Sequence, residues 1–118
     1  MRILVCGARE WSSFNTVYAV LKTYPAGTEV VHGACRGADQ IGGLAAKVLG
    51  FKVYEFPANW EKHGKAAGLI RNQKMLDQGK VDEVLAFHND IERSRGTADM
   101  VRRAKLAGKP CRIVKETE

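Results

Sequence analysis

The stretch VVHGACRGADQIGGLAAKVLG, residues 30–50, decides the predicted fold because it holds a strand, a loop and a helix in succession. Val30 and Val31 form a short apolar run that ends at His32-Gly33, as is typical of a strand buried on both faces. Apolar residues then recur with the spacing of one helix face up to Gly50; they are Ile41, Leu44, Ala45, Val48 and Leu49. This succession predicts one β-α unit of a parallel sheet.

The same alternation of apolar runs and helical patterns extends in both directions from this unit. Strands are expected within residues 3–6, 30–33, 51–56, 81–87 and 110–114. Ser12 and Ser13 are candidate N-caps for the helix that follows the first strand. The order β-α-β-α-β-α-β-α-β predicts an α/β fold of three layers, with about five mostly parallel strands and helices on both faces.

Length and composition limit the class of protein. A chain of 118 residues, 45% of them hydrophobic and 27% charged, has the size and composition of one globular domain. No apolar run approaches the roughly 18 to 20 residues of a membrane span, and the first residues do not form a signal-peptide core. Cys6, Cys35 and Cys111 form neither a zinc spacing nor a disulfide framework. We therefore expect a cytoplasmic protein with no membrane partner, no metal and no cofactor.

The charge is positive and unevenly distributed. There are 19 Lys and Arg residues against 13 Asp and Glu residues, a net charge of +6. Residues 91–118 contain 8 basic and 4 acidic residues, so this last quarter supplies +4 of the total. Such an excess favours anionic partners such as nucleotides or nucleic acid, although an ordinary solvated basic helix has the same pattern.

In a doubly wound sheet, the ligand lies beyond the carboxyl ends of the strands, and the first two strand-end loops contain residues suited to an anionic ligand. Gly7 lets the backbone turn directly after the first strand, and Arg9 can reach an anion. The second loop, residues 33–39, has two glycines and small residues before a helix, which favours phosphate binding by backbone amides. Asp39 either places its charge at the helix N-terminus or contacts a ribose hydroxyl.

The third and fourth loops add further polar residues. Arg71 and Asn72 are expected to project from a helix whose Leu69, Ile70 and Leu76 face the sheet. Thr97 is expected to cap the last helix or to donate to a phosphate. Trp60 is either a stacking surface for a base or part of the core or rim. The predicted ligand-binding residues are Gly7, Arg9, Gly33, Arg36, Gly37, Asp39, Arg71, Asn72, Gly96 and Thr97.

Three histidines and the acidic side chains give little indication of catalysis. His32 is expected to be a hydrogen-bonded residue at a strand end, and His63 and His88 are expected at the surface. The sequence contains no nucleophile elbow, and no acidic pair has a spacing that requires acid-base chemistry. Catalytic residues are therefore not identified.

The strand-end segments together resemble the SLOG superfamily, in particular its YspA-like, YpsA-related branch. The segments that carry this resemblance are GAREW (7–11), HGACRGAD (32–39), FPANW (56–60), GLIRNQKM (68–75) and RGTADMVRRA (95–104). The resemblance implies one Rossmann-like nucleotide-binding domain over residues 1–118, with the ligand at the strand ends. It is also compatible with a homodimer.

Two groups within that superfamily imply different activities. LOG-type phosphoribohydrolases cut the N-glycosidic bond of nucleotides; Arg71 and Met75 match one of their motifs, with Asn72 in place of its lysine, and Gly96 and Thr97 match a second. Met100 occupies the position of their catalytic glutamate, and Asp99 lies one residue earlier. This leaves only Arg71, Asp39 and Asp99 as weak catalytic candidates.

DprA, which binds single-stranded DNA, is similar in its first two strand-end loops and at Asn72. Our leading prediction is binding of a nucleotide or nucleotide-derived ligand, as a sensor, a sequestering protein or a processing factor. The alternatives are hydrolysis of a nucleotide N-glycosidic bond and binding of single-stranded nucleic acid.

Overall fold

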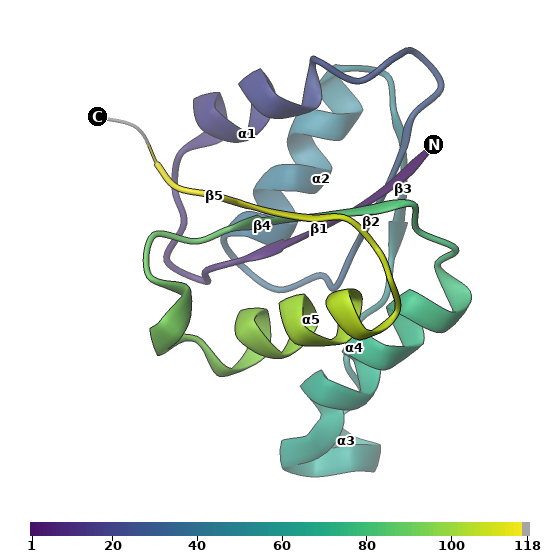
Figure 1. The fold of residues 1–118 in the computed structure, drawn as a ribbon, viewed down its shortest axis with the longest axis vertical. Helices are drawn as coiled ribbons and strands as arrows, with labels where there is room; N and C mark the ends of the chain where they lie inside the picture. Colours follow the sequence, from purple (N-terminus) through teal and green to yellow (C-terminus); the bar gives the residue numbers. More distant parts are fainter. Residues whose placement is uncertain (117–118) are drawn as a thin grey trace.

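A computed structural model describes residues 1–116 and shows one parallel five-stranded sheet (Figure 1). The order β3-β2-β1-β4-β5 places the first strand in the middle, which is the Rossmann arrangement without a sixth strand. The strands are β1 (Arg2–Gly7), β2 (Glu29–His32), β3 (Lys52–Glu55), β4 (Glu83–Phe87) and β5 (Cys111–Val114). The predicted α/β fold is confirmed, with every strand pair parallel; residues 117 and 118 of the predicted domain lie outside the described residues.

Helices cover both faces of the sheet. In Figure 1, α1 (Phe14–Leu21) and α2 (Ala38–Val48) lie on one side, and α4 (Ala67–Gln78) and α5 (Arg95–Leu106) lie on the other. The short helix α3 (Trp60–His63) projects from the end of α4, and two 3-10 turns precede α4 and α5. No helix within residues 1–116 combines the length and the hydropathy that a membrane span requires.

The core has two halves because successive side chains of a strand point to opposite faces. Ile3 and Val5 of β1 pack with the α1 and α2 side chains, whereas Leu4 and Cys6 pack with the α4 and α5 side chains. All four are fully or nearly fully buried, which explains why the sequence of β1 is apolar without interruption. The predicted cap of α1 is also confirmed: the Ser13 hydroxyl accepts the amide hydrogen of Thr16.

Candidate functional site

Two adjoining cavities open at the carboxyl edge of the sheet. The β2–β3 cavity has a volume of about 530 Å³ and lies against the loops that follow β1, β2 and β3. The β1–β4 cavity has a volume of about 680 Å³ and lies beyond the carboxyl ends of the paired strands β1 and β4, between the loops that follow them. Four residues line both cavities: Arg9, Cys35, Trp60 and Arg71. The strand order reverses between β1 and β4, and doubly wound folds bind their ligands at the carboxyl ends of the strands at this point.

Glycines bring the first two loops into close contact. A side chain on Gly7 would overlap the Phe87 carbonyl, and the amide of Ala8 donates to that same carbonyl at 3.0 Å. Gly37 has φ +78° and lies against the Ala8 carbonyl, so it too has no space for a Cβ. Gly7 lines the β1–β4 cavity, whereas Gly37 lines neither cavity and instead joins the two loops.

The second loop is closed around the Asp39 carboxylate. Asp39 is 5% exposed, and its Oδ2 accepts hydrogen bonds from the amides of Gly33 at 3.0 Å and Cys35 at 3.4 Å. Two of the amides that the glycine-rich sequence suggested for phosphate are therefore occupied by the chain's own carboxylate. Burial raises the pKa of Asp39 from 3.8 to about 6, although the charge of Arg71 and the two amides oppose that rise.

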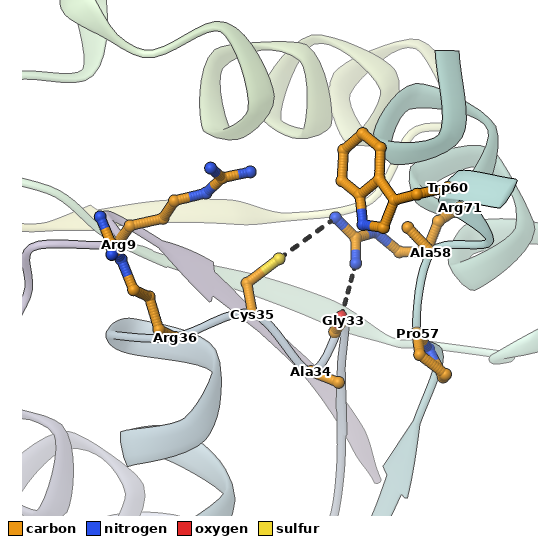
Figure 2. A pocket seen from close by; sticks show the side chains of 9 residues that line it. All are labelled: Arg9, Gly33, Ala34, Cys35, Arg36, Pro57, Ala58, Trp60 and Arg71. Carbon is orange, nitrogen blue, oxygen red and sulfur yellow. Dashed lines mark hydrogen bonds between the residues drawn. The ribbon is translucent and has the colours of Figure 1, made fainter. Parts of the chain in front are cut away.

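Arg71 reaches the same loop from the other side (Figure 2). Its guanidinium donates to the Gly33 carbonyl, to the Cys35 sulfur at 3.6 Å and to the Asn72 side-chain oxygen at 3.2 Å. A side chain at position 33 would overlap this guanidinium, so Gly33 is required for the contact. The loop is thus fixed through its amides by Asp39 and through its carbonyl by Arg71.

Trp60 provides an aromatic surface beside Arg71 (Figure 2). Its side chain is 52% exposed, and both the indole and the Arg71 guanidinium lie within 4 Å of the point where a Cβ on Gly68 would be. Trp60 therefore lies on the rim rather than in the core. Trp11, by contrast, is 5% exposed and packs against Phe87, so only a small part of this residue borders the β1–β4 cavity.

Asn72 and Asp99 belong to an internal network between α4 and α5. The Asn72 amide nitrogen donates to the Gly96 carbonyl at 3.2 Å and to Asp99 at 3.1 Å, and Asp99 also accepts from Arg102 and Arg103 at 2.7 Å each. Burial alone would raise the pKa of Asp99, but the hydrogen bonds from Arg103, Asn72 and Arg102 outweigh it and lower that pKa. Asp99 lines neither cavity.

The expected orientation of α4 is wrong at two positions. Ile70 is 42% exposed rather than facing the sheet, and Asn72 is 5% exposed rather than projecting away from it. The reason is the network above: Asn72 is on the buried side because Gly96 and Asp99 of α5 satisfy its amide. Asn72 still lines the β1–β4 cavity.

At the start of α5, the capping residue differs from the expected one. Ser94, not Thr97, is the N-cap, and its hydroxyl accepts the amide hydrogen of Thr97 at 3.0 Å. This leaves the Thr97 hydroxyl without a hydrogen-bond partner among residues 1–116, although Thr97 is only 6% exposed and lines the β1–β4 cavity with Gly96. Among the described residues no buried side-chain oxygen or nitrogen lacks a hydrogen-bond partner, so the unpartnered Thr97 hydroxyl is open to the cavity and available to a ligand.

The two arginines of the first two loops differ in their surroundings. Arg36 forms an exposed ion pair with Glu10 at 3.0 Å and lines only the β2–β3 cavity. Arg9 is exposed and forms no hydrogen bond or ion pair with any residue between 1 and 116. In Figure 2, Arg9 lies on one side of Cys35, and Arg71 and Trp60 lie on the other. Within the same range, no three His, Cys, Asp or Glu side chains are grouped as metal ligands.

His88 was not among the ligand-binding residues predicted from the sequence, yet it lines the β1–β4 cavity. It follows β4 directly, as His32 ends β2, and that shared position at a strand end was the available signal. His32 is buried and hydrogen-bonded, as predicted: its Nδ1 accepts the amide hydrogen of Ala34 at 2.9 Å.

Comparisons with known proteins agree with the resemblance in the strand-end segments. The model of a family described as YAcAr, "YspA, cpYpsA-related SLOG family", matches residues 1–63, a range that contains the loops after β1, β2 and β3. The Gene 61 protein of Mycobacterium phage D29 is 41% identical to this chain over an alignment that covers 92% of this chain and 92% of that protein. No solved structure matches the chain significantly.

Proposed function

The chain belongs to the YspA, cpYpsA-related SLOG family, and from this membership and the two cavities we propose that it binds a nucleotide or nucleotide-derived ligand at the carboxyl edge of the sheet. One observation carries the proposal. The wall shared by both cavities combines a half-exposed indole, Trp60, with two arginines, Arg9 and Arg71. An aromatic plane and guanidinium groups are the two elements that recognise a base and a phosphate.

The phosphate is assigned to the start of α5 and to Arg9. Thr97 offers a hydroxyl without a partner among residues 1–116, and the N-terminus of a twelve-residue helix favours an anion. Of the two arginines in the wall shared by both cavities, Arg71 is hydrogen-bonded, whereas the guanidinium of Arg9 forms no hydrogen bond or ion pair among residues 1–116. The amides of Gly33 and Cys35 are not assigned to the phosphate, because they bind the Asp39 carboxylate.

Calorimetric titration with AMP, ADP, GMP and adenosine tests this assignment. Arg9→Gln should weaken AMP binding about tenfold or more and leave adenosine binding unchanged, because only AMP presents a charged acceptor. Trp60→Ala should weaken both by about tenfold, the order expected for a lost stacking contact. Arg112→Gln is the matched control, since Arg112 is exposed on β5 and lines neither cavity. A wild-type protein that binds none of the three nucleotides would refute the proposal.

Asp39 supports a second candidate, hydrolysis of the N-glycosidic bond of a nucleotide. Asp39 lines the β1–β4 cavity, and the pKa of its carboxyl is raised to about 6, which is suited to exchanging a proton with water at neutral pH. In this reaction the oxygen of water replaces the base at C1′, and the freed base takes up a proton. Release of adenine after incubation with AMP, together with loss of that release in Asp39→Asn, would support hydrolysis. Binding of AMP without release of adenine would refute hydrolysis and support only the binding proposal.

A further inference from the structure

His88 lies at the carboxyl edge of the sheet, next to the point where the strand order reverses between β1 and β4. It is the first residue after β4, and its backbone amide donates to the Val114 carbonyl of β5 at 3.0 Å, which fixes the backbone there. The side chain is half-buried and lines the β1–β4 cavity together with Gly96 and Thr97 of α5. The ring is therefore on the wall of the cavity to which the phosphate has been assigned.

The hydrogen bond at Nδ1 determines which tautomer the neutral ring adopts. Nδ1 of His88 accepts the amide hydrogen of Asp90 at 2.9 Å. A nitrogen that accepts cannot also carry the hydrogen, so the neutral imidazole carries it on Nε2. Among residues 1–116, Nε2 of His88 has no hydrogen-bond partner. The ring consequently presents one oriented and unused donor.

His32 uses the same local arrangement in a closed environment. Its Nδ1 accepts the amide hydrogen of Ala34, also at 2.9 Å and also two residues further along the chain. His32 is only 4% exposed, however, and its Nε2 lies against α2, where a Cβ on Gly43 would be 2.7 Å away. The ring of His32 after β2 is therefore enclosed by a helix, whereas the ring of His88 after β4 borders a cavity.

We propose that His88 is a specificity-determining residue, whose Nε2 hydrogen binds a phosphate oxygen of the nucleotide in the β1–β4 cavity. The inference rests on the proposed function and adds a donor that faces the phosphate from the end of β4. Together with the Thr97 hydroxyl and Arg9, it would favour a phosphorylated ligand over the corresponding nucleoside. Within residues 1–116 the neighbouring Asp90 carboxylate is paired with Arg93 at 3.1 Å and accepts no hydrogen bond from Nε2 of His88.

Two substitutions separate the roles of the two ring nitrogens. In His88→Asn, the side-chain oxygen can accept the Asp90 amide hydrogen in an Asx turn, so the turn is retained and the Nε2 donor is lost. In His88→Gln, the amide nitrogen can replace the Nε2 donor, although the acceptor at the Nδ1 position is lost. His88→Asn should weaken AMP binding by about two- to tenfold and leave adenosine binding and thermal stability unchanged. His88→Gln should bind AMP more tightly than His88→Asn.

The outcomes distinguish this inference from the proposed function. If the wild-type protein binds AMP and His88→Asn binds it equally well, the role of His88 is refuted and the proposed function stands. If AMP, ADP and GMP all fail to bind the wild-type protein, both are refuted. Nitrogen-15 NMR of the free protein gives an independent check: the Nε2–H tautomer of His88 supports the inference, and the Nδ1–H tautomer overturns it.

Discussion

Asp39→Asn should remove a pH dependence from the stability of the protein. Burial raises the pKa of Asp39 to about 6, whereas the unfolded chain has the usual value of 3.8. The folded state therefore holds this proton more tightly, and the stabilisation by the protonated carboxyl is complete below pH 3.8 and is lost as the pH rises through 6. The difference between a pKa of 3.8 and a pKa of about 6 corresponds to about 3 kcal/mol in the free energy of unfolding.

Asparagine keeps an oxygen that can accept the Gly33 and Cys35 amides but does not ionise. The free energy of unfolding of Asp39→Asn, minus that of the wild type, should thus increase by about 3 kcal/mol between about pH 3.5 and pH 7. Urea unfolding at half-unit pH steps measures the difference, and carbon-13 NMR of the carboxyl measures its pKa directly. A difference that stays constant, or that decreases with pH, would refute the reasoning, since Arg71 and the two amides would then dominate over burial.

Asp99→Asn should show the opposite trend, because hydrogen bonds hold the pKa of Asp99 below its usual value. At pH 7 the free energy of unfolding of the variant should be about 1–3 kcal/mol lower than that of the wild type. Urea unfolding should show this difference becoming smaller as the pH falls below 4. Gly37→Ala should cost about 3 kcal/mol or more, because φ is +78° and a Cβ would meet the Ala8 carbonyl. Gly96→Ala is its control: no atom lies within 4 Å of that Cβ, so thermal unfolding should change by less than about 1 kcal/mol. An equal loss in both glycine variants would contradict the steric explanation.

The succession of strands and helices could be predicted from the sequence because its causes are local. Alternate residues of β1 enter different halves of the core, so the strand must be apolar throughout, and a run such as Ile3–Cys6 is visible without a structure. The Ser13 cap is a contact between residues three positions apart and is equally visible. The location of the two cavities at the strand ends could be anticipated from the same information, since ligands of such folds lie there.

The use of individual polar groups could not be predicted, because it depends on partners distant in sequence. Asn72 is buried since Gly96 and Asp99, more than twenty residues away, satisfy its amide, and a helical pattern contains no trace of that contact. The glycine-rich loop suggested free amides, but Asp39 turns its carboxylate onto two of them.

The sequence by itself therefore determined which segments form the carboxyl edge of the sheet and which residue types gather there. Only the tertiary structure decided which donors at that edge have no partner among residues 1–116, including those of Arg9, Thr97 and His88. The physical reason is that a backbone pattern depends on neighbours along the chain. Whether a side-chain donor is satisfied depends instead on which atoms folding brings within hydrogen-bond distance.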